Sequence, residues 1–277
     1  MRAAEAPADD SLPPRHRTSQ QRRRWWIHLV ILGSYPVLAA VLGAGRTEAR
    51  TPALGRTPWG LLIVCSYQIG MFAVLFGLAW LASHVSRSDL KLRWRPGIWV
   101  LPLGIAYSLG LRLALATIAA FVVVALATTQ VIRLQDLQQL VQTNRPNVGA
   151  LVDVAALRNN PAYFWLNLTL VSFVVAGLRE ELWRAAMLAG LRSLWPDWFF
   201  SYPGEIAAVG VTSALFGLGH LSQGPVAVGA AALLGFGLGT IMVLHRSIWP
   251  AVIAHGLFDA TTFAVLPWLM EQLPRVR

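Results

Sequence analysis

The stretch REELWRAA, residues 179–186, decides how this chain is organised. It places two arginines and two glutamates between the apolar runs VSFVVAGL (171–178) and MLAGL (187–191). A charged side chain at the centre of a membrane helix costs roughly 2.5–3.5 kcal/mol, so four unpaired charges would cost on the order of 10 kcal/mol. These four side chains must therefore be paired, lie at the membrane interface, or face a water-filled cavity.

The composition is that of a membrane protein. Of the 277 residues, 56% are hydrophobic and only 13% are charged, about half the charged fraction of soluble domains. Apolar runs of about 20 residues, the length that crosses a bilayer, recur along the chain. We predict an all-α, polytopic membrane helix bundle of about seven transmembrane helices, with eight as the alternative. The seven spans are expected at 25–45, 59–83, 97–131, 161–178, 204–221, 225–244 and 249–269.

The net charge of +10 suggests a lipid partner rather than nucleic acid. The basic residues gather in loops beside the apolar spans, and this distribution sets the orientation of a membrane protein. Arg87, Lys91, Arg93 and Arg95 follow the second span in this way. We therefore expect an integral protein, in the bacterial inner (plasma) membrane, with a cytoplasmic N-terminus. The sequence gives no indication of the oligomeric state.

The chain divides into four segments. They are a disordered basic tail (1–24), the N-terminal membrane helices with their loops (25–159), a helix bundle that carries the polar motifs (160–269), and a C-terminal tail (270–277). The apolar run at 25–45 is predicted to be an uncleaved anchor, with a signal peptide as the alternative.

The third apolar run, 97–131, is too long for one upright helix. At ~1.5 Å per residue it would extend ~50 Å, well beyond the ~30 Å hydrocarbon core. A tilted helix, a helix that projects from the membrane, and a break near Arg112 are all consistent with the sequence.

Polar and aromatic residues recur at a spacing of four in the last third of the chain. Residues four apart share one face of a helix, so three helices would each present a pair inward. The pairs are Glu180 with Arg184, Phe216 with His220, and His255 with Asp259. Taken singly, each has a structural explanation, such as a salt bridge at the interface or a hydrogen bond to a neighbouring helix. Together, carboxylates and imidazoles in a low-dielectric cavity can activate water or bind a divalent metal.

On these residues the chain resembles the CPBP family of intramembrane proteases, also called Abi or type II CAAX-protease-like proteins. That family carries Glu-Glu-x-x-x-Arg, then Phe-x-x-x-His, then His-x-x-x-Asn or Asp. The second motif stands here as Phe216-Gly-Leu-Gly-His220 and the third as His255-Gly-Leu-Phe-Asp259. The resemblance covers about residues 160–269.

The first motif departs from the family spacing. Only Leu182 and Trp183 lie between Glu181 and Arg184. An alignment on the arginine makes Glu180 the second glutamate of the motif, with Arg179 in the place of the first. An alignment on the glutamate pair brings the arginine one residue early. The helical spacing favours Glu180 as the catalytic carboxylate, with Glu181 as support, because Glu180 shares the face of Arg184.

The resemblance implies hydrolysis of a peptide bond in a membrane-associated protein or peptide. Glu180 would take a proton from a water molecule held by His220 and His255. Asp259 would orient His255 or face the substrate, and Arg184 would fix the carboxylate of Glu180.

Two mechanisms fit this set of residues equally. In one, a divalent metal, zinc in the first place, is held by Glu180, His220, His255 and Asp259. In the other, the glutamate activates the water without a metal. Phe216 belongs to the support of the site in either case.

Two other functions remain open. A non-catalytic scaffold or immunity-type protein of the same fold fits the altered first motif, and it would keep its role without His220 and His255. A proton-coupled transporter also buries histidine and glutamate in membrane helices. It would move a substrate across vesicles without cleaving it. Whether a substrate is prenylated is not encoded in these motifs.

Overall fold

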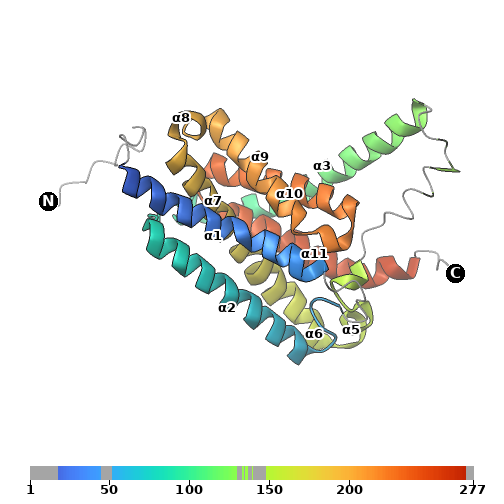
Figure 1. Cartoon of the computed structure of the whole chain (residues 1–277). Coiled ribbons are helices and arrows are strands. Elements are labelled where there is room, and N and C mark those ends of the chain that lie inside the picture. The colour runs from blue at the N-terminus through green and yellow to red at the C-terminus, as the bar shows by residue number, and fades with distance from the viewer. Residues whose placement is uncertain are drawn as a thin grey trace.

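The computed structural model describes residues 18–44, 52–129 and 148–272, together with 133, 135, 136 and 139. Within these residues every regular element is a helix, as predicted. The long helices lie side by side in a bundle, and the second half of α3 (Val100–Thr128) extends away from it (Figure 1).

Seven long helices and several short ones follow one another along the described chain. The long helices are α1 (Ser19–Ala44), α2 (Pro58–Ser83), α3, α7 (Arg179–Leu194), α9 (Tyr202–Leu218), α10 (Pro225–His245) and α11 (Trp249–Gln272). The short ones are η1 (Gly97–Trp99), η2 (Val148–Ala150), α5 (Val154–Asn159), α6 (Pro161–Leu166), η3 (Asn167–Leu178), α8 (Pro196–Phe199) and η4 (Leu221–Gln223). Several of these helices have proline in the first turn. Backbone N–H groups there have no partner within the helix, so the lack of an N–H in proline removes no hydrogen bond.

Helix α1 begins six residues before the expected first span, so residues 19–24 of the predicted disordered tail are helical. The cause is a capping box that the sequence contains as Thr18-Ser19-Gln20-Gln21. The backbone N–H of Gln21 donates to Oγ1 of Thr18 at 3.3 Å, and the N–H of Thr18 donates to Oε1 of Gln21 at 3.1 Å. This exchange satisfies two backbone donors and starts the helix. The rest of the predicted tail, 1–17, lies outside the described residues.

Five helical segments of the described chain are long and apolar enough to cross a membrane. They are Pro58–Ser83, Gly97–Thr128, Pro161–Leu194, Pro225–His245 and Trp249–Gln272. This establishes a polytopic helical membrane protein, whereas the predicted count of seven or eight spans stays a prediction. The predicted spans at 25–45 and 204–221 correspond to α1 and α9.

The third apolar run forms one helical segment without a break at Arg112. The arginine is held from outside its own helix, because its Nη2 donates to Oγ1 of Thr262 in α11 at 3.0 Å. Beyond this contact, large apolar side chains of α3 such as Phe121 are exposed. After α3, the next fully described stretch is 148–160, which contains η2 and α5.

Helix α7 lies at the centre of the bundle and is buried from Trp183 to Leu191 on almost every side. It continues α6 and η3 as one helical segment, Pro161–Leu194, of which η3 is π-helical. Helix α11 packs along η3 and α3, and α10 packs along α9. Helix α1 covers α7 and α2. The charged stretch REELWRAA therefore starts α7 inside the bundle, with α11 beside it.

Candidate functional site

Two of the three polar motifs meet between α7 and α11. Nδ1 of His255 lies 3.1 Å from Oε1 of Glu181, and both side chains are buried. The third motif reaches the same place through an aromatic ring, because the ring of Phe216 in α9 lies edge-on to His255 with centroids 6.2 Å apart. Three segments that are distant in the sequence thus converge on one imidazole.

The two neighbouring glutamates have different surroundings. Glu181 is fully buried, and Oε2 is paired with the guanidinium of Arg184. Glu180 is 18% exposed, and its Oε1 accepts a hydrogen bond from Nη2 of Arg179 at 2.7 Å. The predicted pairing of Glu180 with Arg184 is therefore wrong. On a helix the positions i+3 and i+4 are both neighbours, and here Arg184 takes the i−3 partner, Glu181.

The second ring nitrogen of His255 faces two carboxylates at longer range. Nε2 lies 3.8 Å from Oε2 of Glu180 and 3.8 Å from Oδ2 of Asp259. These distances are too long for direct hydrogen bonds, and polar groups separated in this way are commonly bridged by water. Asp259 is 27% exposed, so this side of the imidazole is the more open one.

His220 lies just past the end of α9 rather than within it. Its Nδ1 is 3.0 Å from the carbonyl oxygen of Phe216, and its ring stacks edge-on to the Phe216 ring with centroids 4.8 Å apart. Among the described residues no hydrogen bond or ion pair joins His220 to Glu180 or Glu181. It interacts electrostatically with Asp259, and in this way it belongs to the same group.

Arg184 is completely buried, and two glycines of α10 make room for it. A Cβ at Gly235 would lie 3.1 Å from Nη2 of Arg184 and 2.9 Å from Cδ1 of Phe216. A Cβ at Gly239 would lie 3.1 Å from Cδ of Arg184. The guanidinium carbon lies 5.0 Å from the centroid of the Phe216 ring, a cation–π geometry. Any larger residue at these two positions would compete with the arginine for space.

Residues that the motifs do not contain also hold the site. Nη1 of Arg179 donates to Oε1 of Gln68 in α2 at 2.7 Å, and its guanidinium lies 5.7 Å from the ring centroid of Tyr35. Arg112 in α3 donates to the carbonyl oxygen of Phe258, next to Asp259. The signal for Gln68 and Arg112 was present in the sequence, since each is a polar residue inside an apolar span.

The predicted metal ligands are not arranged as a metal site in this structure. No three His, Cys, Asp or Glu side chains of the described residues are grouped so that they could hold one ion. Glu180, His255 and Asp259 lie close together, with Nδ1 of His255 bonded to Glu181 and Nε2 facing the other two carboxylates at 3.8 Å. A metal requirement therefore stays a prediction.

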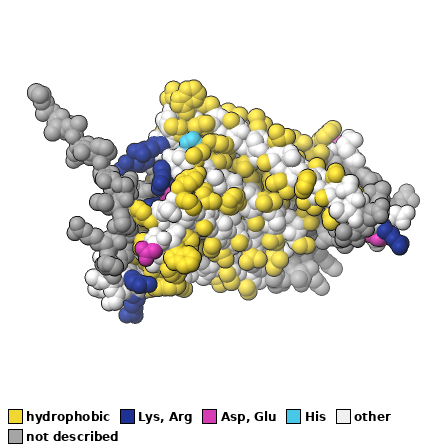
Figure 2. Space-filling model, turned by 90° about the horizontal axis from the view of Figure 1, so that it is seen from above, with side chains coloured by type: hydrophobic (Ala, Val, Ile, Leu, Met, Phe, Trp, Pro, Cys, Tyr) yellow, Lys and Arg dark blue, Asp and Glu magenta, His cyan; other side chains and the backbone are white. Residues whose placement is uncertain are grey.

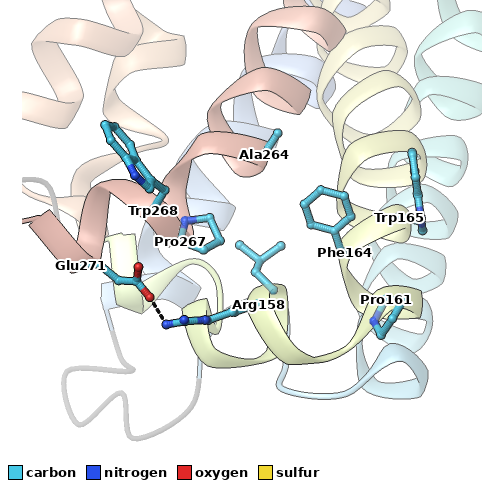
Figure 3. Close-up of a pocket in the computed structure, with 9 residues that line it drawn as sticks. Arg158, Pro161, Phe164, Trp165, Ala264, Pro267, Trp268 and Glu271 are labelled. Carbon is cyan, nitrogen blue, oxygen red and sulfur yellow. Dashed lines mark hydrogen bonds and ion pairs between the residues drawn. The ribbon is translucent and has the colours of Figure 1, made fainter.

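A cavity of about 440 Å³ lies elsewhere, at the far end of α11 (Figure 3). Phe164 and Trp165 line it from α6, and Trp268 from α11, while an ion pair joins Arg158 to Glu271 at its edge. None of the predicted site residues lines this cavity.

The fold and the site define a polytopic helical membrane protein with paired ionisable groups inside its bundle. Residues 161–261 match the family model described as Type II CAAX prenyl endopeptidase Rce1-like, which is a protease family. The match confirms the resemblance to the CPBP, or CAAX-protease-like, family, and it includes all three motifs. Neither curated proteins nor solved structures give a match to this chain.

Proposed function

We propose that this protein is an intramembrane endopeptidase that hydrolyses a peptide bond of a membrane-associated substrate, with Glu180 as the general base. The family match supports a protease. The observation that carries the assignment is the gap of 3.8 Å between Nε2 of His255 and one oxygen each of Glu180 and Asp259. A water molecule at that place would contact a base and an imidazole at once.

The two glutamates are proposed to have different roles, one structural and one catalytic. Both oxygens of Glu181 have partners, His255 and Arg184, so this carboxylate is suited to orient the imidazole. Glu180 keeps Oε2 directed toward the gap and is the more accessible of the two. A positioned carboxylate that accepts a proton from water contributes typically 10²–10⁴-fold to a hydrolysis rate.

The remaining groups have roles that follow from their places. The hydroxide formed when Glu180 takes the proton attacks the peptide carbonyl carbon, and the proton is then delivered to the leaving nitrogen. Asp259 faces Nε2 of His255 from the more open side of the ring, where it would contact the bound water or the substrate. His220, which interacts electrostatically with Asp259, would contact the same water or the carbonyl group. Arg179 fixes Glu180 through the short hydrogen bond to Oε1.

The test is cleavage by the full-length protein in proteoliposomes. The substrates are two quenched fluorescent peptides with the same C-terminal CAAX sequence, one farnesylated on cysteine and one not. We expect Glu180→Gln to lower kcat by about 10²–10⁴-fold. The matched control is Glu271→Gln, which changes the same group at the edge of the distant cavity and should leave kcat unchanged.

The alternatives give different results in the same preparation. Undiminished cleavage by Glu180→Gln would remove Glu180 from the mechanism. Solute flux across the vesicles without cleavage would favour a transporter. If neither peptide is cleaved and His220→Ala and His255→Ala keep the biological role, the chain is a scaffold of this fold. Measuring the zinc content of the purified protein tests whether zinc is bound by the four predicted ligands.

A further inference from the structure

A second group of charges, most of them buried, lies at the other end of α7 from the glutamate pair. Four segments supply it: Lys91 from the loop after α2, Arg192 from the last turn of α7, Glu205 from the first turn of α9, and Arg246 from the end of α10. We call these four residues the Glu205 cluster.

The single carboxylate of the Glu205 cluster forms ion pairs with three cations. Oε1 of Glu205 lies 3.4 Å from Nζ of Lys91 and 3.0 Å from Nη1 of Arg192. Oε2 lies 3.2 Å from Nη1 of Arg246. Within the described residues no second carboxylate is paired with any of the three cations, so two positive charges remain in excess.

The excess charge is held where water is scarce. Lys91 and Glu205 are almost fully buried, and Arg192 is 18% exposed. The buried Nε of Arg192 has no hydrogen-bond partner among the described residues. Burying a charge without compensation is unfavourable, so a negatively charged group would stabilise the cluster. Arg246 is 52% exposed, so such a group can approach the cluster from the side of this residue.

The loop that carries Lys91 is fixed to the start of α11. The N–H of Ile248 donates to the carbonyl oxygen of Lys91 at 3.0 Å, and Oγ of Ser247 donates to that of Arg93 at 2.7 Å. The backbone of the loop that carries Lys91 is therefore held in place by the start of α11. Indole rings stand beside them, since Trp94 and Trp249 lie with centroids 5.2 Å apart and Trp94 is exposed.

This end of the molecule has the features of a headgroup region. Figure 2 shows Lys and Arg side chains gathered at one end of the molecule, beside a body covered by apolar side chains. Exposed tryptophans next to basic residues are typical of the boundary between lipid tails and water. An anion that reaches Arg246 from this boundary is most readily the phosphate of a lipid.

We propose that the Glu205 cluster binds the phosphate group of an anionic phospholipid, with Arg246 as the residue that contacts it first. Arg192 and Lys91 are the buried cations whose charge the phosphate at Arg246 compensates. Arginine suits this role because its guanidinium can donate two parallel hydrogen bonds to phosphate oxygens. The site is independent of peptide hydrolysis and would stabilise the fold whether or not the proposed protease activity is present.

The experiment uses the full chain in nanodiscs of phosphatidylcholine, without and with added phosphatidylglycerol, and a third set with inorganic phosphate instead. Thermal unfolding and lipid retention in native mass spectrometry are measured. We expect phosphatidylglycerol to raise the unfolding temperature, and Arg246→Gln to weaken its retention about tenfold or more. The matched control is Arg158→Gln, which removes an exposed arginine that is also paired with a glutamate, Glu271.

Each other outcome overturns the proposal. Equal loss of phosphatidylglycerol binding in Arg246→Gln and Arg158→Gln would show that the lipid responds to the net charge of the protein and not to the Glu205 cluster. The same stabilisation by inorganic phosphate, with no further gain from phosphatidylglycerol, would exclude a lipid as the ligand. A wild-type chain that does not respond to phosphatidylglycerol would show that the cluster binds no lipid phosphate.

Discussion

Nδ1 of His255 lies 3.1 Å from Oε1 of Glu181, although 74 residues separate the two in the sequence. A carboxylate can only accept a hydrogen bond, so Nδ1 carries the proton and donates it. This fixes the tautomer of the neutral ring and directs Nε2 toward Glu180 and Asp259. The buried glutamate thus sets the chemistry of the nitrogen on the opposite side of the ring.

Exchanging the two glutamates for glutamine should separate catalysis from stability. Glu181→Gln removes the charge that compensates the buried Arg184, and losing one partner of a buried ion pair costs about 3–5 kcal/mol. Glu180→Gln leaves this pair intact, so its unfolding temperature should stay close to that of the wild type while cleavage falls. Thermal unfolding in detergent and the peptide assay measure the two effects. A stable Glu181→Gln with an unstable Glu180→Gln would reverse the assignment of roles.

Helix α10 offers a matched pair of glycines for testing how Arg184 is accommodated. A Cβ at Gly239 would lie 2.6 Å from Cγ1 of Val209 and 3.1 Å from Cδ of Arg184, whereas a Cβ at Gly229 meets nothing within 4 Å. We expect Gly239→Ala to destabilise the protein by about 1–3 kcal/mol through overpacking. Gly229→Ala should be neutral or stabilising by about 1 kcal/mol, because alanine favours a helix. Denaturant unfolding compares them, and equal stability of the two variants would contradict the close approach.

The sequence predicted the long helices and the three polar motifs, because apolar length and four-residue spacing are local properties of the chain. It did not predict which glutamate meets Arg184. Positions i+3 and i+4 are both neighbours on a helix, and the room for the arginine comes from Gly235 and Gly239 on another helix. The early start of α1 was readable as the capping box of Thr18 and Gln21, but the run of arginines that follows suggested a tail instead.

The position of His220 shows a second limit of spacing arguments. Four residues after Phe216 it was expected on the same helical face, yet α9 ends at Leu218 and His220 follows in the turn. The two rings still lie edge-on, so the neighbourhood was predicted although the helix was not. Contacts from α2 and α3, through Gln68 and Arg112, depend on how distant helices pack, which no local pattern contains.

Arg112 provides a test of positioning without contact to the reacting atoms. Its guanidinium carbon lies 4.2 Å from the centroid of the Phe258 ring, and Nη2 donates to the carbonyl oxygen of that residue, one position before Asp259. A lysine cannot reproduce this fork of donors. If the proposed site is correct, Arg112→Lys should lower kcat by up to about 10²-fold through displacement of Asp259, with little change in KM. Arg158→Lys is the matched control, and an equal loss in both variants would argue against a specific role.

Lys91 predicts a pH dependence of stability. Burial lowers the pKa of its amine from 10.5 to about 8, because desolvation outweighs the attraction of Glu205. Between these two values the unfolded chain binds more protons than the folded one, so the free energy of unfolding rises with pH. Below pH 8 both states are protonated, and the full penalty of the buried charge is present.

The variant Lys91→Met has no amine to titrate at this position. In zwitterionic detergent we expect the wild type to gain stability relative to Lys91→Met as the pH rises from about 7 to about 10. Thermal unfolding of both proteins across this range gives the difference curve, in which other titrating groups cancel. Parallel curves would show that the amine keeps its ordinary pKa in the fold.

Lys91 is also the chain's single lysine, and its buried amine shares the carboxylate of Glu205 with two arginines. Reagents that attach dyes, biotin or cross-linkers to lysine therefore have a single target side chain, and that side chain is buried. Arginine side chains do not react with these reagents, so probes on the helices of this protein are better attached through an introduced cysteine.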